Sequence, residues 1–328
     1  DVFRDNGFLA LRNLTEPIAG AKGYVTRDGD KLKLAGGDEA RFFAVNVSAE
    51  AAAQSRASVD YLARKLAKLG VNMVRYHSPL FEGGDIEKVN PQKLDNLQYL
   101  VAAMKKQGIY THLSFYFPLW VDVKPAHGIE GFDTIQNKKP FGLIFFDERL
   151  QELHRGWMRQ ALTAANPYGD PLGREPALAA IELVNEDSLF FHTFSKQNIP
   201  AVQWKKLETK LGGAILPAWD MTRDGISKGG PDKLERMRKQ VKFLAELQRD
   251  FYAGATQFLK RDLGYKGLVV AGNWTTADKA TLDPIERWTY RATDIIDKHG
   301  YFGGKHAGEG AGYSCLLYTS PSPRDATL

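Results

Sequence analysis

The stretch that decides the fold is Ala179-Ala-Ile-Glu-Leu-Val-Asn-Glu186, an apolar run that ends in an amide and a carboxylate. A short, mostly apolar run of this kind is typical of a parallel strand that is buried on both faces. The loop that follows it is polar and aromatic. In barrels built from strands alternating with helices, catalytic side chains gather at the C-terminal tips of the strands. The stretch therefore predicts a buried strand that places Asn185 and Glu186 at a functional site.

The same unit, a helix followed by a strand, recurs along the chain. Helical patterns stop at Gly70, Gly108 and Gly264, and an apolar run follows each of these glycines. We expect strands over residues 41–48, 71–76, 109–117, 177–184, 267–272 and 294–297. We expect helices over residues 59–69, 94–106, 150–165, 234–263 and 284–293. This alternation predicts a parallel sheet with helical crossovers.

Two α/β folds have this alternation, an open doubly wound sheet and an eight-stranded TIM barrel. The glycine-rich phosphate-binding motifs of doubly wound nucleotide folds are absent from the sequence. Polar and aromatic residues instead follow the ends of five strands, and they are Arg75, His77, Tyr116, Asn185, Glu186, Asn273, Trp274, His299 and Tyr301. Such convergence is what a barrel active site requires. We therefore predict a (β/α)8 TIM barrel that is truncated after about strand six and preceded by a β-hairpin around Asp28-Gly29.

The composition narrows the classes of protein and of partner. The chain has 328 residues, of which 43% are hydrophobic and 25% charged, as in ordinary globular domains. The net charge of +5 is dispersed among acids along helical stretches such as residues 233–249, which favours a solvated helix face over a nucleic-acid surface. The sequence contains no apolar run of about 18 residues, so we expect no membrane span. It begins with Asp and shows no signal peptide.

The last residues differ in character from the rest. Residues 315–325, from Cys315 to Asp325, resemble the translation of a transposon adapter used in DNA sequencing libraries. We expect a β-rich lead-in at residues 1–40, a partial catalytic barrel at residues 41–314 and a non-biological tail at residues 315–328. Cys315 is the sole cysteine, so we expect neither disulfides nor thiol chemistry. We also expect the natural protein to continue past Ser314.

Three motifs resemble those of a known family. Glu182-Leu-Val-Asn185-Glu186 is similar to the E-x-x-N-E motif on strand four of retaining glycoside hydrolases in the cellulase-like barrel superfamily, of the clan A, family 5 type. His299-Gly-Tyr301 resembles the H-x-Y pattern at the end of strand six in that group, and Arg75 stands where the group keeps an arginine. The resemblance covers roughly residues 23 to 303.

The chain also departs from the family pattern at two positions. Asp187 follows the Asn-Glu pair where a proline is usual, and Tyr116 stands where the family often has a histidine. The subfamily, the sugar, the linkage and endo or exo action therefore stay open.

The resemblance implies a retaining glycosidase that acts on β-linked glycans or glycosides. It implies that Glu186 is the acid/base, that Asn185 binds the sugar 2-hydroxyl, and that Arg75 and Tyr301 orient the nucleophile beside His299. Such an enzyme needs a second carboxylate about 5–5.5 Å from the first. We expect it at the tip of a seventh strand beyond this sequence, with Glu309 only a loop residue. We therefore expect this chain, made as printed, to be inactive.

The predicted contacts with a carbohydrate substrate come from Tyr116, Trp120, Trp274, His77 and Asn273, because aromatic faces stack on the apolar faces of sugars. Several of the residues singled out in the sequence have simpler interpretations. Glu186 could be a solvated loop carboxylate and Arg75 a structural ion-pair partner. His77, His112 and the aromatic residues could belong to the core. By resemblance alone, we expect the full-length protein to be extracellular or periplasmic.

Two other functions compete with the glycosidase interpretation. One is a carbohydrate-binding barrel that has lost catalysis. The other, less favoured, is a metal-dependent barrel hydrolase. The first predicted strand ends Val45-Asn-Val-Ser48, without the H-x-H opening of such enzymes, and no H-E-x-x-H motif occurs. We therefore expect no metal and no other cofactor.

Overall fold

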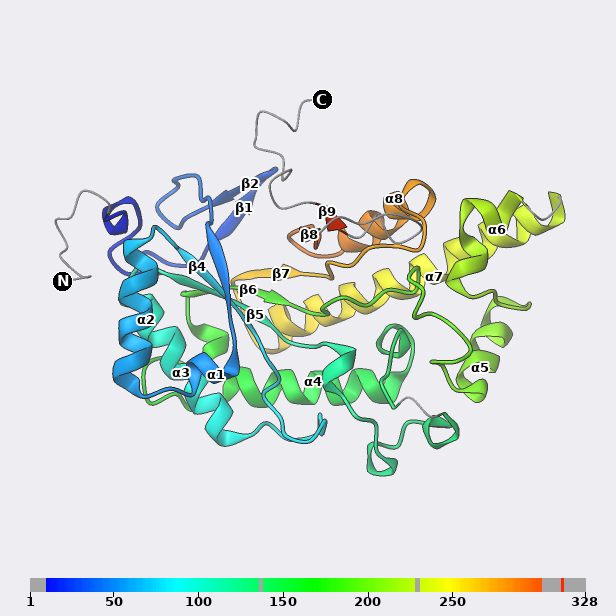
Figure 1. Cartoon of the computed structure of the whole chain (residues 1–328), viewed down its shortest axis with the longest axis horizontal. Coiled ribbons are helices and arrows are strands. Elements are labelled where there is room, and N and C mark those ends of the chain that lie inside the picture. The colour runs from blue at the N-terminus through cyan, green and yellow to red at the C-terminus, as the bar shows by residue number, and fades with distance from the viewer. Residues whose placement is uncertain (1–9, 136–137, 228–230, 303–313, 316–328) are drawn as a thin grey trace.

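The computed structural model describes residues 10–135, 138–227, 231–302 and 314–315, and its centre is a five-stranded parallel sheet (Figure 1). The strands, in sheet order, are β3 (Ala44–Val47), β4 (Met73–His77), β5 (Tyr110–Ser114), β6 (Leu178–Glu182) and β7 (Leu268–Val270). Every pairing is parallel, and neighbours along the chain are neighbours in the sheet. This order matches consecutive barrel strands and lacks the reversal of a doubly wound sheet. The predicted partial barrel is confirmed, and within these residues the sheet is open.

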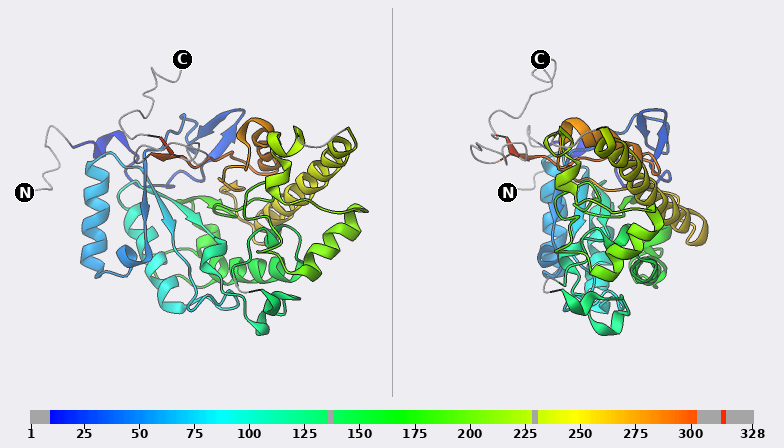
Figure 2. Two further views of the ribbon diagram at one scale, coloured as in Figure 1. Left: turned by 45° about the vertical axis from the view of Figure 1, so that its right-hand side comes forward. Right: turned by 90° about the vertical axis from the view of Figure 1, so that its right-hand side faces the viewer.

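Helices carry the chain from each strand to the next. They are α1 (Ala49–Ala52), α2 (Arg56–Lys68), α3 (Pro91–Lys105), α4 (Glu148–Thr163), α5 (Ala201–Leu211), α6 (Arg223–Ser227), α7 (Pro231–Gln257) and α8 (Lys279–Tyr290). Four of them begin at a side-chain cap that accepts a backbone N–H bond three residues on, namely Ser55, Asn90, Asp147 and Asp278. Figure 2 shows α2 at one end of the molecule and α5 and α6 at the other.

Two predicted elements differ from the structure. The sixth strand, expected at residues 294–297, is a single bridge between Ile295 and Val270. The carboxylate of Asp294 accepts the N–H of Val269 at 2.8 Å, so a side chain takes the place of the next rung of the ladder. The helix expected from Pro284 begins at Lys279 instead, because Asp278 caps its first turn and Pro284 lies inside it.

The N-terminal segment covers the end of the sheet opposite to the polar residues. The predicted hairpin is present, with β1 (Thr26–Asp28) antiparallel to β2 (Lys31–Lys33). A small core joins residues of this segment to residues of β4, β5, β6 and β7, and its members are Ala19, Val25, Ala40, Met73, Tyr110, Ala177, Ala179, Ala180, Leu268 and Val270. The N–H of Gly20 also donates to the hydroxyl of Tyr110 at 3.0 Å. The lead-in therefore packs against the barrel as part of one folded unit.

The main core lies between the sheet and its helices. Trp157 of α4 is 1% exposed and meets Phe81 and Phe115 edge to face, with ring centroids 5.0 and 5.2 Å away.

Near the C-terminus, β8 (Tyr301–Phe302) pairs in parallel with β9 (Ser314–Cys315). In the described residues, no helix combines the length and the apolar character that crossing a bilayer requires.

Gly108 illustrates how tightly the lead-in is packed. Its φ is +71°, and a Cβ added there would lie 1.8 Å from the carbonyl oxygen of Glu16. Gly212 has a φ of +74°, and a Cβ added to it would have no other atom within 4 Å. We expect Gly212→Ala to lower the free energy of unfolding by about 1 kcal/mol, and Gly108→Ala to lower it by roughly 2–4 kcal/mol, because it adds a steric clash. Urea unfolding measures both values, and equal losses would contradict this packing.

Candidate active site

The register of the sheet brings polar residues side by side. Asn46 lies opposite Arg75, Arg75 opposite His112, and Ser114 opposite Glu182. Side chains two residues apart on a strand point to the same face. Arg75 and His77 therefore share the face that His112 and Ser114 occupy on the next strand. This face is the interior of the predicted barrel.

A buried ion pair forms the base of the site. Glu182 has no exposed surface, and Arg75 binds it at two points, with Nε 3.0 Å from Oε2 and Nη2 2.8 Å from Oε1. Ser114 Oγ donates to Oε1 at 2.7 Å, and His112 Nε2 lies 3.6 Å from Oε2. Burial alone would raise the pKa of Glu182, but Arg75, His112 and Ser114 together hold that pKa below its usual value. Glu182 is therefore a carboxylate at neutral pH.

Arg75 also orients Asn185. Its Nη2 donates to Asn185 Oδ1 at 2.8 Å, and Asn273 Nδ2 donates to the same oxygen at 3.3 Å. The backbone N–H of Asn185 donates to the carbonyl of Tyr116 at 2.7 Å. With its side-chain oxygen occupied, Asn185 offers its amide N–H groups to a ligand.

Glu186 has an unusual backbone conformation. Its φ of +48° is the only positive value of a non-glycine residue in the described part of the chain. Its N–H donates to Asn273 Oδ1 at 2.9 Å, and its Oε1 lies 2.7 Å from His299 Nδ1. The left-handed region costs such a residue about 1–3 kcal/mol, which persists only where the surroundings impose it. Asn273 and His299 therefore hold the backbone and the carboxyl group of Glu186 in one position.

These side chains line a cleft of about 460 Å³. Its residues are Asn46, Arg75, His77, Asn185, Glu186, Lys298, His299 and Gly300. Five of the residues singled out in the sequence thus lie at one site, although they come from the ends of β4 and β6 and from His299. The burial of His77, together with the charge of Arg75, lowers the pKa of His77 to about 4, so that its ring is neutral at pH 7. Trp120 packs on this ring, with the two ring centroids 4.6 Å apart.

Two predicted substrate contacts require correction. Tyr116 has no exposed surface and meets His154 edge to face, so its ring belongs to the core and only its carbonyl serves the site. Asn273 is also fully buried and acts through Asn185 and Glu186. Trp274 is partly exposed beside Phe191, with ring centroids 5.1 Å apart. The side chain of Tyr301 and the whole of Glu309 lie outside the described residues.

Sequence reasoning assigned no role to Glu182, Ser114 or Lys298. Glu182 did carry a signal, since a charge inside an apolar strand requires a partner of opposite charge. Lys298 adjoins His299 and donates to the carbonyl of Trp274 at 2.8 Å. Its Nζ also lies 2.7 Å from Asp283 Oδ1, a contact that no sequence pattern predicts.

One group of side chains at this site has the composition of a metal site. Glu182, Asp297 and His299 offer donor atoms within 4.8 Å of one another. However, both oxygens of Glu182 already accept bonds from Arg75, and a guanidinium in that position repels a cation. The arrangement as it stands therefore suits a carboxylate ion pair better than a metal ion.

Asp187 occupies the position where the family usually has proline. It is fully buried, and its two oxygens accept the N–H groups of Gly142 and Ser188 at 2.8 and 3.0 Å. Burial, with the charge of Glu286 adding to it, raises the pKa of Asp187 to about 7. Ser188 Oγ in turn donates to Glu286 Oε2 at 2.7 Å. These bonds anchor the start of the loop after β6.

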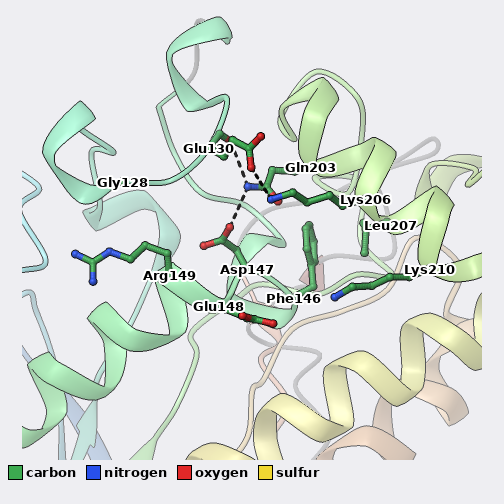
Figure 3. A pocket seen from close by; sticks show the side chains of 10 residues that line it. All are labelled: Gly128, Glu130, Phe146, Asp147, Glu148, Arg149, Gln203, Lys206, Leu207 and Lys210. Atoms are coloured by element: carbon green, nitrogen blue, oxygen red, sulfur yellow. Dashed lines mark hydrogen bonds and ion pairs between the residues drawn. The ribbon is translucent and has the colours of Figure 1, made fainter.

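A separate hollow of about 390 Å³ lies between the start of α4 and helix α5 (Figure 3). None of the residues predicted for the site lines it. Gln203 is buried and donates to Asp147 Oδ2 at 3.0 Å and to the carbonyl of Glu130 at 3.2 Å, and Lys206 pairs with the carboxylate of Glu130. The polar groups that line the hollow thus largely bind one another, and we interpret the hollow as a junction between helices.

Comparison with known proteins bears on the fold. No protein-family model and no curated protein sequence matches the chain. An endo-1,4-β-mannanase from Rhizomucor miehei has a similar structure, with 12% identity and a TM-score of 0.50, over 89% of this chain and 67% of that one. A β-mannanase from the blue mussel Mytilus edulis, also 12% identical, gives a TM-score of 0.46 over 89% and 77% of the two chains.

A family 5 mannosidase from Rhizomucor miehei, at 12% identity, gives a TM-score of 0.41 over 89% of this chain and 93% of that one. The similarity to the Rhizomucor mannanase establishes the fold alone, because the identity is low. The chain therefore has a partial TIM-barrel fold similar to that of this mannanase, as the alternation of its strands and helices predicted.

The ion pair at the base of the site predicts a stability effect. Arg75→Met leaves Glu182 as a buried charge without a partner, so we expect the free energy of unfolding to fall by about 3–5 kcal/mol. Adding Glu182→Gln removes that charge and should restore most of the loss. Urea unfolding at pH 7 of the two single variants and the double variant measures the coupling. A double variant less stable than Arg75→Met would contradict it.

Asp187 predicts a pH dependence. Its pKa rises from 3.8 to about 7 on folding, so between these values the folded protein holds a proton that the unfolded chain has released. Its contribution to stability is therefore present at low pH, falls as the pH rises through this window, and levels off above about 7. We expect Asp187→Asn to gain stability relative to the parent protein between pH 4 and 8. Thermal unfolding across this range measures the difference, and a difference that does not vary with pH would contradict the assignment.

Proposed function

We propose that this chain carries the acid/base half of a retaining glycoside hydrolase site that acts on β-linked glycans. The observation that carries the proposal is Glu186 at the tip of β6, held in a left-handed backbone conformation and bonded to His299 in an open cleft. A solvated loop carboxylate would need neither the strain nor the buried amide of Asn273 that maintains it.

The chemistry requires one group that first gives and then takes a proton. The carboxyl of Glu186 would protonate the glycosidic oxygen as the bond breaks, and its carboxylate would then activate water. An Nδ1–H on His299 would donate to Glu186 Oε1 in both stages, which leaves the proton transfer to Oε2. Asn185, fixed by Arg75, would direct its amide N–H toward the sugar 2-hydroxyl.

The second carboxylate is the nucleophile, and Glu182 is unsuited to that role. It has no exposed surface, and both of its oxygens accept bonds from Arg75. We propose that the nucleophile stands on a further strand, encoded past Ser314, where Arg75 and Tyr301 would orient it. Asp297 is the acid to test as a rival, because it lies within 4.8 Å of donor atoms of His299 and Glu182.

The substrate class follows from the same site. The cleft is lined by amide, imidazole and ammonium groups that bond hydroxyls, and the aromatic ring of Trp120 packs on His77, one of the cleft residues. The structural neighbours are named as mannanases and a mannosidase. We therefore propose β-mannans and manno-oligosaccharides as the first substrates to test. A polymeric substrate would place the full-length protein outside the cytoplasm.

The competing function is a carbohydrate-binding barrel without catalysis. Two observations favour it: the sheet is open, and Glu186 is the one carboxylate among the described residues that line the cleft. Such a protein would bind β-glycans without cleaving them, even when the chain is extended past Ser314. A metal-dependent hydrolase would lose its activity to a chelator, whereas the proposed mechanism is insensitive to one.

The acid/base role predicts a kinetic signature for Glu186→Gln. In a protein extended by the source sequence past Ser314, we expect the anomeric configuration to be retained. Proton NMR of the first product measures this. Glu186→Gln should lower kcat roughly 10²–10⁴-fold on glycosides with poor leaving groups. The loss of cleavage should be much smaller on activated aryl glycosides, because these need little protonation. Glu152→Gln, at an exposed ion pair with Arg149, is the matched control.

Two outcomes would contradict the proposal. Equal loss on poor and activated leaving groups would remove the acid/base role from Glu186. Hydrolysis by the chain as printed would show that the nucleophile is already present. The loss of that hydrolysis in Asp297→Asn would then assign the nucleophile to Asp297.

A further inference from the structure

A run of four aromatic rings crosses the loop after β6. We call Trp219, His192, Phe191 and Trp274 the aromatic strip. Trp219 stacks on His192 with ring centroids 3.6 Å apart and planes inclined by 19°; the next two centroid distances, from His192 to Phe191 and from Phe191 to Trp274, are 4.9 and 5.1 Å. Trp219 is 56% exposed, and the other three residues are partly exposed. The strip therefore presents aromatic surface to solvent.

The exposed indole stands on a fixed turn. Trp219 belongs to the 3-10 turn η7 (Ala218–Met221), and its neighbours at both ends of that turn, Ala218 and Met221, are fully buried. Gln240 of α7 is also fully buried, and its side chain bonds both the N–H and the C=O of Leu216, at 2.8 and 2.6 Å. A ring held on such a support loses little conformational entropy when a ligand stacks on it.

A second exposed tryptophan shows the contrast. Trp288 of α8 is 41% exposed, but the guanidinium of Arg249 lies over its ring at 4.7 Å and donates to its carbonyl. Trp288 thus has a local role as a cation–π partner. The ring of Trp219 instead meets His192, and burial lowers the pKa of His192, so that this ring is neutral at pH 7.

The strip begins at the candidate active site. Trp274 follows Asn273, whose amide binds both Asn185 and Glu186. Lys298, which lines the cleft beside His299, donates to the carbonyl of Trp274. From there the rings run outward to η7, in the segment between α5 and α6 that Figure 1 shows far from the β1–β2 hairpin. The strip therefore starts one residue away from Asn273, a side chain that positions the candidate active site.

We propose that the aromatic strip is a distal subsite, in which Trp219 stacks on a sugar unit of the same β-linked glycan whose cleavable bond lies at Glu186. The apolar face of a pyranose ring fits an aromatic face, and Trp219 stays 56% exposed although its ring also stacks on His192. This inference rests on the proposed function. It adds that the natural substrate is an oligosaccharide or polysaccharide longer than the cleft itself holds.

The test is equilibrium binding, which needs no turnover. Manno-oligosaccharides and gluco-oligosaccharides with β-linkages, from disaccharide to hexasaccharide, are titrated into the chain as printed by isothermal calorimetry. We expect affinity to rise with length. Trp219→Ala should weaken binding of the hexasaccharide roughly tenfold, the loss of one stacking contact, while binding of the disaccharide stays unchanged. Trp219→Phe should keep most of the affinity, and Trp288→Ala should match the parent protein.

The outcomes separate cleanly. No length dependence in the parent protein, or equal hexasaccharide affinity in Trp219→Ala, would overturn the distal subsite. So would equal losses for both lengths, or the same loss in Trp288→Ala. Circular dichroism and the melting temperature should be unchanged in Trp219→Ala, because the ring is mostly exposed. A failed acid/base test at Glu186 leaves this binding readout intact, so the two proposals fail independently.

Discussion

The ion pair between Arg75 and Glu182 is the interaction on which the site depends. It joins β4 to β6 across β5 inside the sheet, and Glu182 is ionised there because Arg75, His112 and Ser114 outweigh the cost of burial. Well-packed apolar residues often stabilise a fold as much as a buried ion pair does. The particular contribution of the Arg75–Glu182 pair is to position other side chains, since the same guanidinium fixes Asn185 next to Glu186.

The loop after β6 extends this order outward. Asp187 and Ser188 fix its first turn through Gly142 and Glu286, and Glu186 accepts a strained backbone immediately before them. The same loop continues to Phe191, His192 and the turn that holds Trp219. If this loop carries the proposed acid/base carboxyl and the proposed stacking ring, it would suit a long substrate, because each contact with the glycan would position the next sugar.

Local signals predicted most of the architecture. Glycines marked the ends of helices, apolar runs marked the five strands, and their alternation predicted parallel order, which the structure has. The errors came from competition that a linear pattern does not show. The carboxylate of Asp294 replaced a ladder bond in the sixth strand, and the cap at Asp278 outweighed Pro284 as the start of α8. Tyr116 and Asn273 were expected at the substrate, yet both are fully buried.

The sequence by itself determined the order of strands and helices. It also indicated Arg75, Asn185, Glu186 and His299 as site residues, because they stand at or near the ends of predicted strands. It could do so because propensity, capping and periodicity act over a few residues. Only the tertiary structure decided that Arg75 pairs with Glu182, that His299 reaches Glu186, and that Trp219 joins Trp274 through two other rings. These contacts join residues far apart in the chain, and their partners are selected by sheet register and loop packing.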